Sequence, residues 1–520
     1  MSANPPSRTR ISRFLCWLPA VVLSLVSLAA PAQTAKPLSH DDIAWLQRAT
    51  FGIDSASVAR YQKLGRGRYL DEELEARNDT LPPAISRMIS SYAVINTPPG
   101  QLLMAYRDQQ QQFRNTPDGD AKEAGKKAVQ AYRRKLYRQD AQVELLHAIY
   151  GGDQLKEQMV WFWLNHFSVY AAKSRVRLVA AEYEENAIRP HALGKFRDLL
   201  LATLKSPAML EFLDNAKNIK DKTNENYARE LMELHTLGVG SGYTQQDVQQ
   251  LALILTGAGI ALRDNAQGGW RYRMPRVVRD GMFVFNPNKH DFGDKVFLGH
   301  TIKGSGYDEI EQALTLITRQ PACAQFVSRQ LAEYFVADQP PPALLAAMAR
   351  TFQRTDGDIA AVLRTMFTSH ALTASYGGKF KDPTQFMVSA MRLTYDGRPI
   401  SNAAPLVNWL NQMGEPVYGR ITPDGWPLDA ASWSGSGQMA KRFEVARIIG
   451  SGRNRLFMGD DASDDEALKA RAGVPELDTP LYHLAIEPYL SGATRTALGK
   501  ANSAPEWNTF LLSSPDFNYR

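Results

Sequence analysis

Cysteine is almost absent from this chain of 520 residues, which has only Cys16 and Cys323. Cys16 lies in an N-terminal segment that we expect to be removed, so Cys323 would have no intrachain partner. The sequence therefore excludes an intrachain disulfide, whatever the redox state of the compartment. Stability must come from a buried core, and the chain is long enough for one large domain or for two to three ordinary ones.

The short motifs of several common enzyme classes are also missing. The chain has no Walker phosphate loop, no paired-cysteine motif, no His-Glu-x-x-His helix and no Gly-x-Ser-x-Gly turn. Without the first 32 residues and their three arginines, 57 basic side chains stand against 54 acidic ones. Nucleic-acid binding usually needs a concentrated basic patch, which this balance does not indicate. We expect no nucleic-acid partner and no nucleotide cofactor.

Acidic residues are absent before Asp41, and this N-terminal part has the order of a secretory signal peptide. Three arginines precede an apolar run over residues 15–30, which ends in the small-x-small pattern Ala30-Pro31-Ala32. The run is short for a membrane-spanning helix of about 20 residues, although an uncleaved anchor is the alternative. We predict a signal peptide over residues 1–32, cleaved after Ala32 or Ala35. The mature protein would be periplasmic or secreted, with no stable membrane span.

Apolar residues recur mostly three and four positions apart, which is the spacing of buried helix faces. Residues 268–303 break this pattern, because Trp270–Arg273 and Met282–Phe285 have strand-like content. We predict a mainly α fold: a large multi-helix domain with a small β-hairpin or sheet insertion around residues 268–303. The main helical domain would span residues 36–455, with a C-terminal extension of short helices over 456–520 packing on it.

Local patterns mark three helix starts. Thr244 begins a capping box, Pro340-Pro341-Pro342 leads into a helix, and residues 355–358 cap the next one.

The segment over residues 224–238 carries the most suggestive polar side chains, and it reads as a helix ended by a glycine. Asn226, Glu230 and Glu233 fall along one flank of this helix, and His235 lies on the other. An amide and two carboxylates at the edge of a core suit a divalent cation or a general acid–base pair. The alternative is that Arg229 forms ordinary helix ion pairs with Glu225 and Glu233, which leaves Glu230 least explained.

A second candidate lies in the aromatic segment 161–167. Apolar residues surround this predicted helix on all sides, so we expect it to be buried. Burial would keep His166 neutral and able to accept a proton or bind a metal, while the adjacent Asn165 would orient substrate. The plainer interpretation is a core histidine with satisfied hydrogen bonds.

Two further places carry charged or imidazole side chains. His290 and Asp291 form a pair in a predicted loop between strands, where functional residues are common but where turn-forming residues also occur for local reasons. Arg189-Pro190-His191 marks a helix end, and its basic groups either meet an anion or act only as a cap.

These segments resemble a bacterial family of exported proteins catalogued as domain of unknown function 1800. The resemblance rests on six segments: FWLNHF at 162–167, IRPHALGKFRDLLLATLKSPAMLEFLDN at 188–215, NENYARELMELHTLGVGSG at 224–242, HDFGDKVFLG at 290–299, TDGDIAAVLRTMFTS at 355–369 and GWP at 425–427. It covers nearly all of the chain after the predicted signal peptide.

The resemblance implies an exported protein, often encoded beside a second exported protein similar to sulfatases or alkaline phosphatases, and it implies no agreed activity. Many members have His-Asn-His where this chain has Leu164-Asn165-His166. A two-histidine metal site is therefore not carried over to this chain, although His166 itself is present.

Our leading hypothesis is an envelope-associated enzyme of the hydrolase or lyase type. Its predicted catalytic residues are Glu230, Glu233, His166, His290 and Asp291, and its predicted substrate-binding residues are Asn165, Asn226, His235, Arg189 and His191. Glu230 would act as general base or metal ligand, with a divalent ion as the cofactor that suits such groups.

The alternative hypothesis is a non-catalytic periplasmic binding or assembly protein that acts with its phosphatase- or sulfatase-like neighbour. In that case Glu230 and Glu233 would pair only with arginines.

Overall fold

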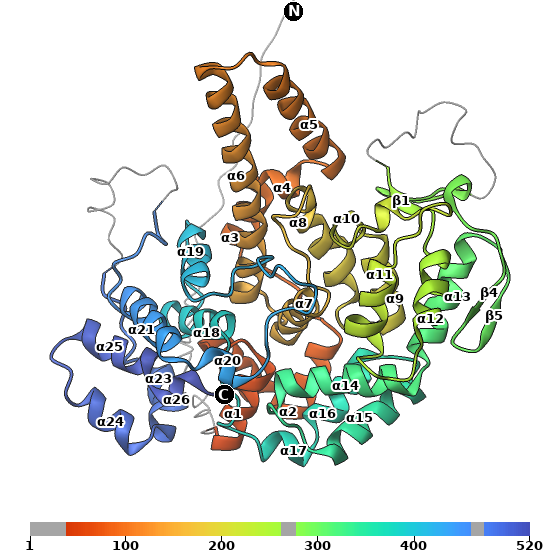
Figure 1. Ribbon diagram of the computed structural model, residues 1–520. Coiled ribbons are helices and arrows are strands. Elements are labelled where there is room, and N and C mark those ends of the chain that lie inside the picture. Colours follow the sequence, from red (N-terminus) through yellow and green to blue (C-terminus); the bar gives the residue numbers. More distant parts are fainter. Residues whose placement is uncertain (1–37, 262–276, 459–472) are drawn as a thin grey trace, which may run out of the picture. The chain divides into compact units, whose positions relative to one another are not determined.

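Helices dominate the computed structural model, which describes residues 38–261, 277–458 and 473–520 (Figure 1). The predicted mainly α fold class is therefore confirmed. The predicted signal peptide lies outside the described residues. Among the described helices, none is both long enough and apolar enough to cross a membrane.

The predicted helix starts are found where their capping chemistry requires them. The Thr244 hydroxyl accepts the Asp247 N–H at 3.2 Å while the Asp247 carboxylate accepts the Thr244 N–H at 2.8 Å, so both satisfy backbone groups at the start of α12, Gln245–Ile254. Helix α15, Pro342–Arg354, begins with a proline, and Asp358 caps α16, Ile359–Phe367.

The first half of the described chain packs around α6, Asp120–Tyr150, which contacts α3, α4, α5, α7 and α8 and also reaches the later helices α18 and α19 (Figure 1). The other elements of this half are α1 His40–Ala49, α2 Ser55–Leu74, α3 Pro83–Ser91, α4 Ala93–Asn96, α5 Pro99–Asn115, α7 Gln154–His166, η1 Val176–Leu178, α8 Ala180–Glu182, η2 Tyr183–Ile188, η3 Arg189–His191, α9 Phe196–Lys205, α10 Pro207–Phe212, η4 Asn215–Lys217, α11 Asn226–Glu230 and η5 Leu231–Thr236.

Two small antiparallel sheets follow α12 and confirm the predicted β insertion. Strand β3, Phe283–Phe285, pairs with both β1, Ala258–Ile260, and β2, Val278–Asp280. After the short helix η7, Pro287–Lys289, strands β4, Lys295–Phe297, and β5, His300–Ile302, form a hairpin. The first strand begins ahead of the predicted boundary, because Gly257 adopts a φ of +83° and turns the chain directly out of α12. The expected strand at Trp270–Arg273 lies outside the described residues.

The remaining helices complete one hydrophobic core that continues through the described elements. They are α13 Tyr307–Thr318, α14 Pro321–Phe335, α17 His370–Thr373, α18 Pro383–Tyr395, α19 Ala404–Gln412, α20 Ala430–Trp433, α21 Ser436–Gly450, α23 Pro480–Ala485, η8 Glu487–Tyr489, α24 Gly492–Leu498, α25 Ala504–Ser513 and α26 Pro515–Asn518. Among the last elements, α25 packs on α21, and Tyr519 pairs with Phe380 ahead of α18. The proposed boundary at residue 455 stays a prediction.

Helix α7 is buried along almost its whole length, as its sequence predicted. Trp163 is fully buried, and its indole N–H donates to the Ala192 carbonyl at 2.9 Å. This burial fixes the end of α7, where Asn165 and His166 lie.

The segment 224–238 differs from a regular helix. The α-helical turns of α11 continue into a π-helix, η5, in which the Thr236 hydroxyl donates to the Leu231 carbonyl five residues earlier at 2.6 Å. The segment ends at Gly238 with a φ of +85°, as its glycine predicted. The wider π turn changes the directions of Glu233 and His235 from those of a regular helix.

Candidate functional site

The C-terminal end of α7 borders a pocket of about 220 Å³ that also involves η5, α14 and the loop ahead of α20. Its polar lining side chains are Asn165, His166, Glu233, Gln330 and Asp424, and Phe326 and Trp426 supply aromatic surface. The pocket therefore brings together three segments that carry the family resemblance, FWLNHF, the region 224–242 and GWP.

His166 is held in one orientation and kept neutral. Its Nε2–H donates to the His235 carbonyl at 2.9 Å, which leaves Nδ1 with the lone pair. Burial lowers the pKa of His166 to about 4. The hydrogen bond to the His235 carbonyl raises the pKa and offsets only part of this effect. A neutral imidazole in a pocket wall is able to accept a proton.

His235 lies behind His166, away from the lining. It is 1% exposed, its ring centroid is 6.1 Å from that of His166, and its Nε2 has no hydrogen-bond partner among the described residues. Burial and then the neighbouring His166 lower its pKa to about 3. His235 therefore supports His166 through its carbonyl and does not itself reach the pocket.

Asn165 joins α7 to the loop that carries Trp426. Its Oδ1 accepts the Trp426 N–H at 2.6 Å and its Nδ2 donates to the Trp426 carbonyl at 2.9 Å. Gly425 allows this contact, because it has a φ of +74° and a β-carbon there would lie 2.3 Å from the Asn165 carbonyl oxygen. Asn165 thus shapes the pocket through the backbone of the loop.

Two carboxylates, Glu233 and Asp424, line the pocket, and the predicted residue Glu230 lies near both of them outside the lining. Neither Glu230 nor Glu233 has an ion-pair partner within 4.0 Å among the described residues, since Arg229 pairs with Glu225 at 3.1 Å. Burial, the adjacent Glu233 and Asp424 raise the pKa of Glu230, and Arg229 opposes them. Asp424 accepts from Arg420 at 2.7 Å, and hydrogen bonds to Arg420 and Thr422 hold its pKa below the usual range despite partial burial. The site therefore combines groups that release protons at different pH.

The loop pair His290 and Asp291 belongs to another cluster. His290 Nε2 is 2.9 Å from Glu309 and its Nδ1 is 2.8 Å from the Thr256 carbonyl, while Lys295 Nζ is 2.7 Å from the other Glu309 oxygen. His290 is 1% exposed, and neither it nor Asp291 lines the pocket beside His166. The structure does not bring this predicted pair to the site, because its hydrogen bonds hold the loop against Thr256, just after α12, and against Glu309 of α13.

Three predicted binding residues also lie elsewhere. Arg189 is buried and contacts the carboxylates of Glu157 and Glu184, each at 2.8 Å, in a group that also includes Glu185 and Glu144. His191 is half-buried at the end of η3, and burial lowers its pKa. Asn226 donates to the Leu213 carbonyl at 3.1 Å, which fixes the start of α11.

Sequence reasoning missed Gln330 and Asp424. Asp424 directly precedes the GWP segment, so its position was a usable signal, whereas Gln330 lies on an ordinary amphipathic helix and had none. Within the described ranges, no group of three or more histidine, cysteine, aspartate or glutamate side chains is placed to hold a metal ion.

The sequence profile of the family described as "Protein of unknown function (DUF1800)" matches residues 44–519. The chain belongs to this family, as the resemblance of its motifs predicted. No curated protein and no solved structure matches the chain.

Proposed function

We propose that this member of the DUF1800 family is an exported, envelope-associated enzyme that cleaves a polymer by hydrolysis or elimination at the pocket beside His166. The proposal rests on one observation above all. A neutral histidine, His166, and a carboxylate without an ion-pair partner among the described residues, Glu233, come from separate segments and line one pocket, and Glu230 lies beside Glu233 outside the lining.

The side chains suit acid–base chemistry. Nδ1 of His166 would take a proton from water, or from the carbon next to a carboxyl group, as the bond to be cleaved breaks. Glu230 keeps its proton to higher pH than a free carboxyl and would pass it to the leaving oxygen. Asn165 and Trp426 would hold the loop against the substrate, and Glu233 would orient the attacked group.

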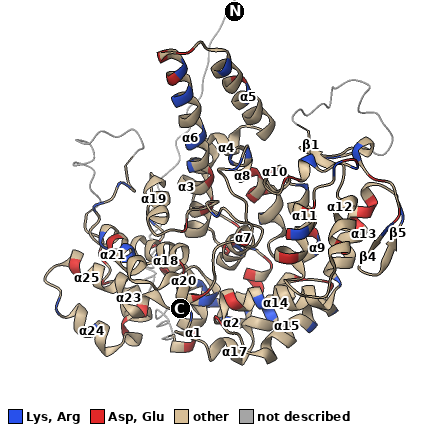
Figure 2. Cartoon of the chain, in the orientation of Figure 1, with Lys and Arg blue, Asp and Glu red and all other residues tan. Residues whose placement is uncertain are grey.

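A groove beside the pocket favours an extended, anionic substrate. It has a volume of about 1110 Å³, runs over residues 238–242 and helices α14 and α15, and shares Val239 and Phe326 with the pocket. Its charged lining side chains are Arg329 and Arg350, both exposed, and Figure 2 shows basic residues on both helices. An anionic polymer in the groove would reach the pocket with one segment.

The test is cleavage of envelope polymers by the purified chain without its first 32 residues, followed as the release of soluble fragments. His166→Gln and Glu230→Gln should each lower the rate by about 10²- to 10⁴-fold, the usual contribution of a general acid or base. Glu225→Gln is the matched control, because Glu225 pairs with Arg229 at 3.1 Å whereas Glu230 has no ion-pair partner among the described residues, and it should keep the full rate. No cleavage by the wild type, or equal rates in all three variants, would contradict the proposal.

The groove also favours a second candidate, in which it receives a segment of the exported phosphatase- or sulfatase-like neighbour. Arg329→Glu with Arg350→Glu would then abolish co-purification with that neighbour while polymer cleavage stays undetectable in every variant. Export itself is tested by cell fractionation, which should place a chain starting after Ala32 or Ala35 outside the cytoplasm.

A further inference from the structure

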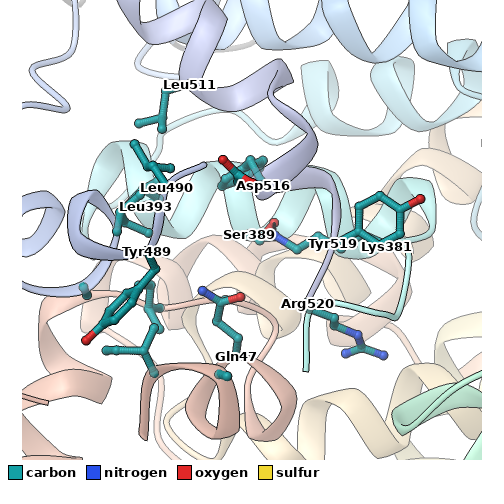
Figure 3. A pocket seen from close by; sticks show the side chains of 18 of the residues that line it. Gln47, Lys381, Ser389, Leu393, Tyr489, Leu490, Leu511, Asp516, Tyr519 and Arg520 are labelled. Carbon is teal, nitrogen blue, oxygen red and sulfur yellow. Dashed lines mark hydrogen bonds between the residues drawn. The ribbon is translucent and has the colours of Figure 1, made fainter. Parts of the chain in front are cut away.

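A second pocket, of about 240 Å³, lies where α1, α18 and the C-terminal segment meet (Figure 3). It shares no lining residue with the pocket beside His166. Leu393, Leu490 and Leu511 give it an apolar part, and Lys381, Ser389 and Arg520 give it a polar part.

Lys381 and Ser389 are in direct contact in this pocket. Lys381 precedes Asp382, the N-cap of α18, and its Nζ lies 3.1 Å from the Ser389 hydroxyl two turns into the helix. Lys381 is 6% exposed and Ser389 is 2% exposed. Gly52 packs against Ser389 so closely that a β-carbon on it would lie 2.6 Å from the serine β-carbon, which fixes the serine in place.

The surroundings of Lys381 disfavour its charged form. Within the described part of the chain it has no carboxylate within 4.0 Å, and its nearest aromatic contact is the Phe517 ring at 4.0 Å. Burial, then Arg520 from the C-terminal segment and Arg442 from α21, lower the pKa of Lys381 to about 7. The acids facing this region are engaged elsewhere: Glu415 accepts from Thr384, Asp516 from Ser491, and Asp382 from the Gln385 N–H.

We propose that Ser389 and Lys381 form a serine–lysine dyad that cleaves an ester of a small acyl group. In the resting chain the Ser389 hydroxyl donates to the Phe386 carbonyl at 3.0 Å and accepts from Lys381 Nζ. In the reaction the hydroxyl turns its proton to the neutral amine of Lys381, which takes it as Ser389 Oγ attacks the carbonyl carbon. The bond to the alcohol breaks, Lys381 returns the proton to the leaving oxygen, and water releases the acyl group from Ser389 by the same route in reverse. The guanidinium of Arg520 donates to Gln158 and to the Tyr334 carbonyl, so it acts on the developing oxyanion only through its positive charge and not as a hydrogen-bond donor.

The size of the pocket selects the substrate class. A volume of about 240 Å³ with leucine side chains on one side suits a short acyl chain, and, unlike the pocket beside His166, this pocket shares no lining residue with the groove along α14 and α15 that would hold a polymer. The activity is independent of the function proposed above, because the two pockets have no residue in common.

The experiment is covalent labelling of the whole protein with a small fluorophosphonate, with the modified residue identified by peptide mass spectrometry. The wild type should carry one adduct, on Ser389, and Ser389→Ala should carry none. Labelling should become about tenfold faster from pH 6 to pH 8, because a base with a pKa near 7 loses its proton over this range.

Two variants separate catalysis from structure. Lys381→Arg keeps a cation and a donor beside the serine but cannot serve as a base, and should slow labelling at least about 100-fold. Ser57→Ala is the matched control, since Ser57 is also buried but accepts from Arg392 at 2.8 Å, and labelling should be unchanged. The absence of an adduct on Ser389 in the folded wild type would overturn the dyad, as would a labelling rate that is flat with pH. The site of the adduct and its pH dependence in the wild type test the dyad even if Lys381→Arg does not fold.

Discussion

At the scale of single residues, His166 shows how far a sequence predicts a site. The apolar residues around it predicted that it would be buried and neutral, and burial does lower its pKa to about 4. The sequence does not predict which nitrogen carries the proton, because that depends on a backbone carbonyl, of His235, 69 residues away. The same limit applied to Asn165, whose partner Trp426 is 261 residues away.

The two buried imidazoles should make stability depend on pH. An unfolded histidine titrates near pH 6.5, whereas the folded pKa values are about 4 for His166 and about 3 for His235. Between about pH 6.5 and pH 3 the folded chain therefore binds fewer protons than the unfolded chain. The unfolding free energy is highest above about pH 6.5 and falls as the pH falls below that value. His235→Asn removes one such group and keeps the backbone carbonyl. Between pH 6.5 and pH 5, the wild type should lose about 1.5 kcal/mol more unfolding free energy than the variant.

Urea unfolding at the two pH values measures this difference, and His300→Asn, which changes an exposed histidine, should behave as the wild type. Parallel pH dependence in the wild type and His235→Asn would mean that His235 is not buried as a neutral ring.

At the scale of elements, the π turns explain what helical periodicity misses. Residues 183–188 and 231–236 both adopt this wider turn. The first turn places Glu184 and Glu185 beside Arg189, and the second places Glu233 at the pocket. The regular spacing of 100° per residue placed Glu233 and His235 on flanks of an ordinary helix. An extra residue in one turn leaves the order of apolar residues almost unchanged, so the sequence predicted the helix but not the directions within it.

The stability of the packing between helix α6 and the π-helix η2 should depend on Arg189, the buried cation among four carboxylates. Arg189→Met leaves Glu144, Glu157 and Glu184 buried without this counterion and should lower the unfolding free energy by about 3–5 kcal/mol at pH 8. Burial already raises the pKa values of Glu144 and Glu157, so acidification should protonate them and reduce the loss. Denaturant unfolding at pH 8 and pH 5 measures both effects.

Arg229→Met provides the comparison, because its pair with Glu225 is exposed and such pairs contribute about 0–1 kcal/mol. Equal losses in the two variants, or a loss from Arg189→Met that grows on acidification, would contradict this role of the cluster.

At the scale of the described body, residues 38–261, 277–458 and 473–520, the fold class and the β insertion followed from the sequence, but the contacts between distant segments did not. Arg520 donates to Gln158 on α7 at 2.7 Å and to the Tyr334 carbonyl on α14 at 2.8 Å. The residues next to Arg520 in the sequence predict neither partner. The pockets beside His166 and Lys381 both arise from such encounters. Motifs showed which residues are unusual, and packing decided which of them share a pocket.

The end of the chain should therefore matter for the stability of the whole body. Removing Tyr519 and Arg520 deletes the pairing with Phe380 and both long-range contacts of Arg520. We expect one cooperative unfolding transition at lower denaturant concentration, with a loss of about 2–4 kcal/mol from buried hydrogen bonds to a charged group. Tryptophan fluorescence and far-ultraviolet circular dichroism should shift together; two separate transitions would show that the end of the chain folds independently.

The proposed function requires that an envelope polymer binds in the pocket beside His166. Nuclear magnetic resonance of the protein with ¹³C-labelled histidines reports on this binding at the residue concerned. Soluble fragments of peptidoglycan and of an anionic envelope polysaccharide serve as probes, and the His166 signal is assigned by its absence in His166→Gln. We predict that one of these fragments shifts the His166 signal in a saturable way and leaves the His290 signal unchanged. A saturable shift of His40, in the pocket of Lys381, with His166 unaffected, or no shift with either fragment, would contradict it.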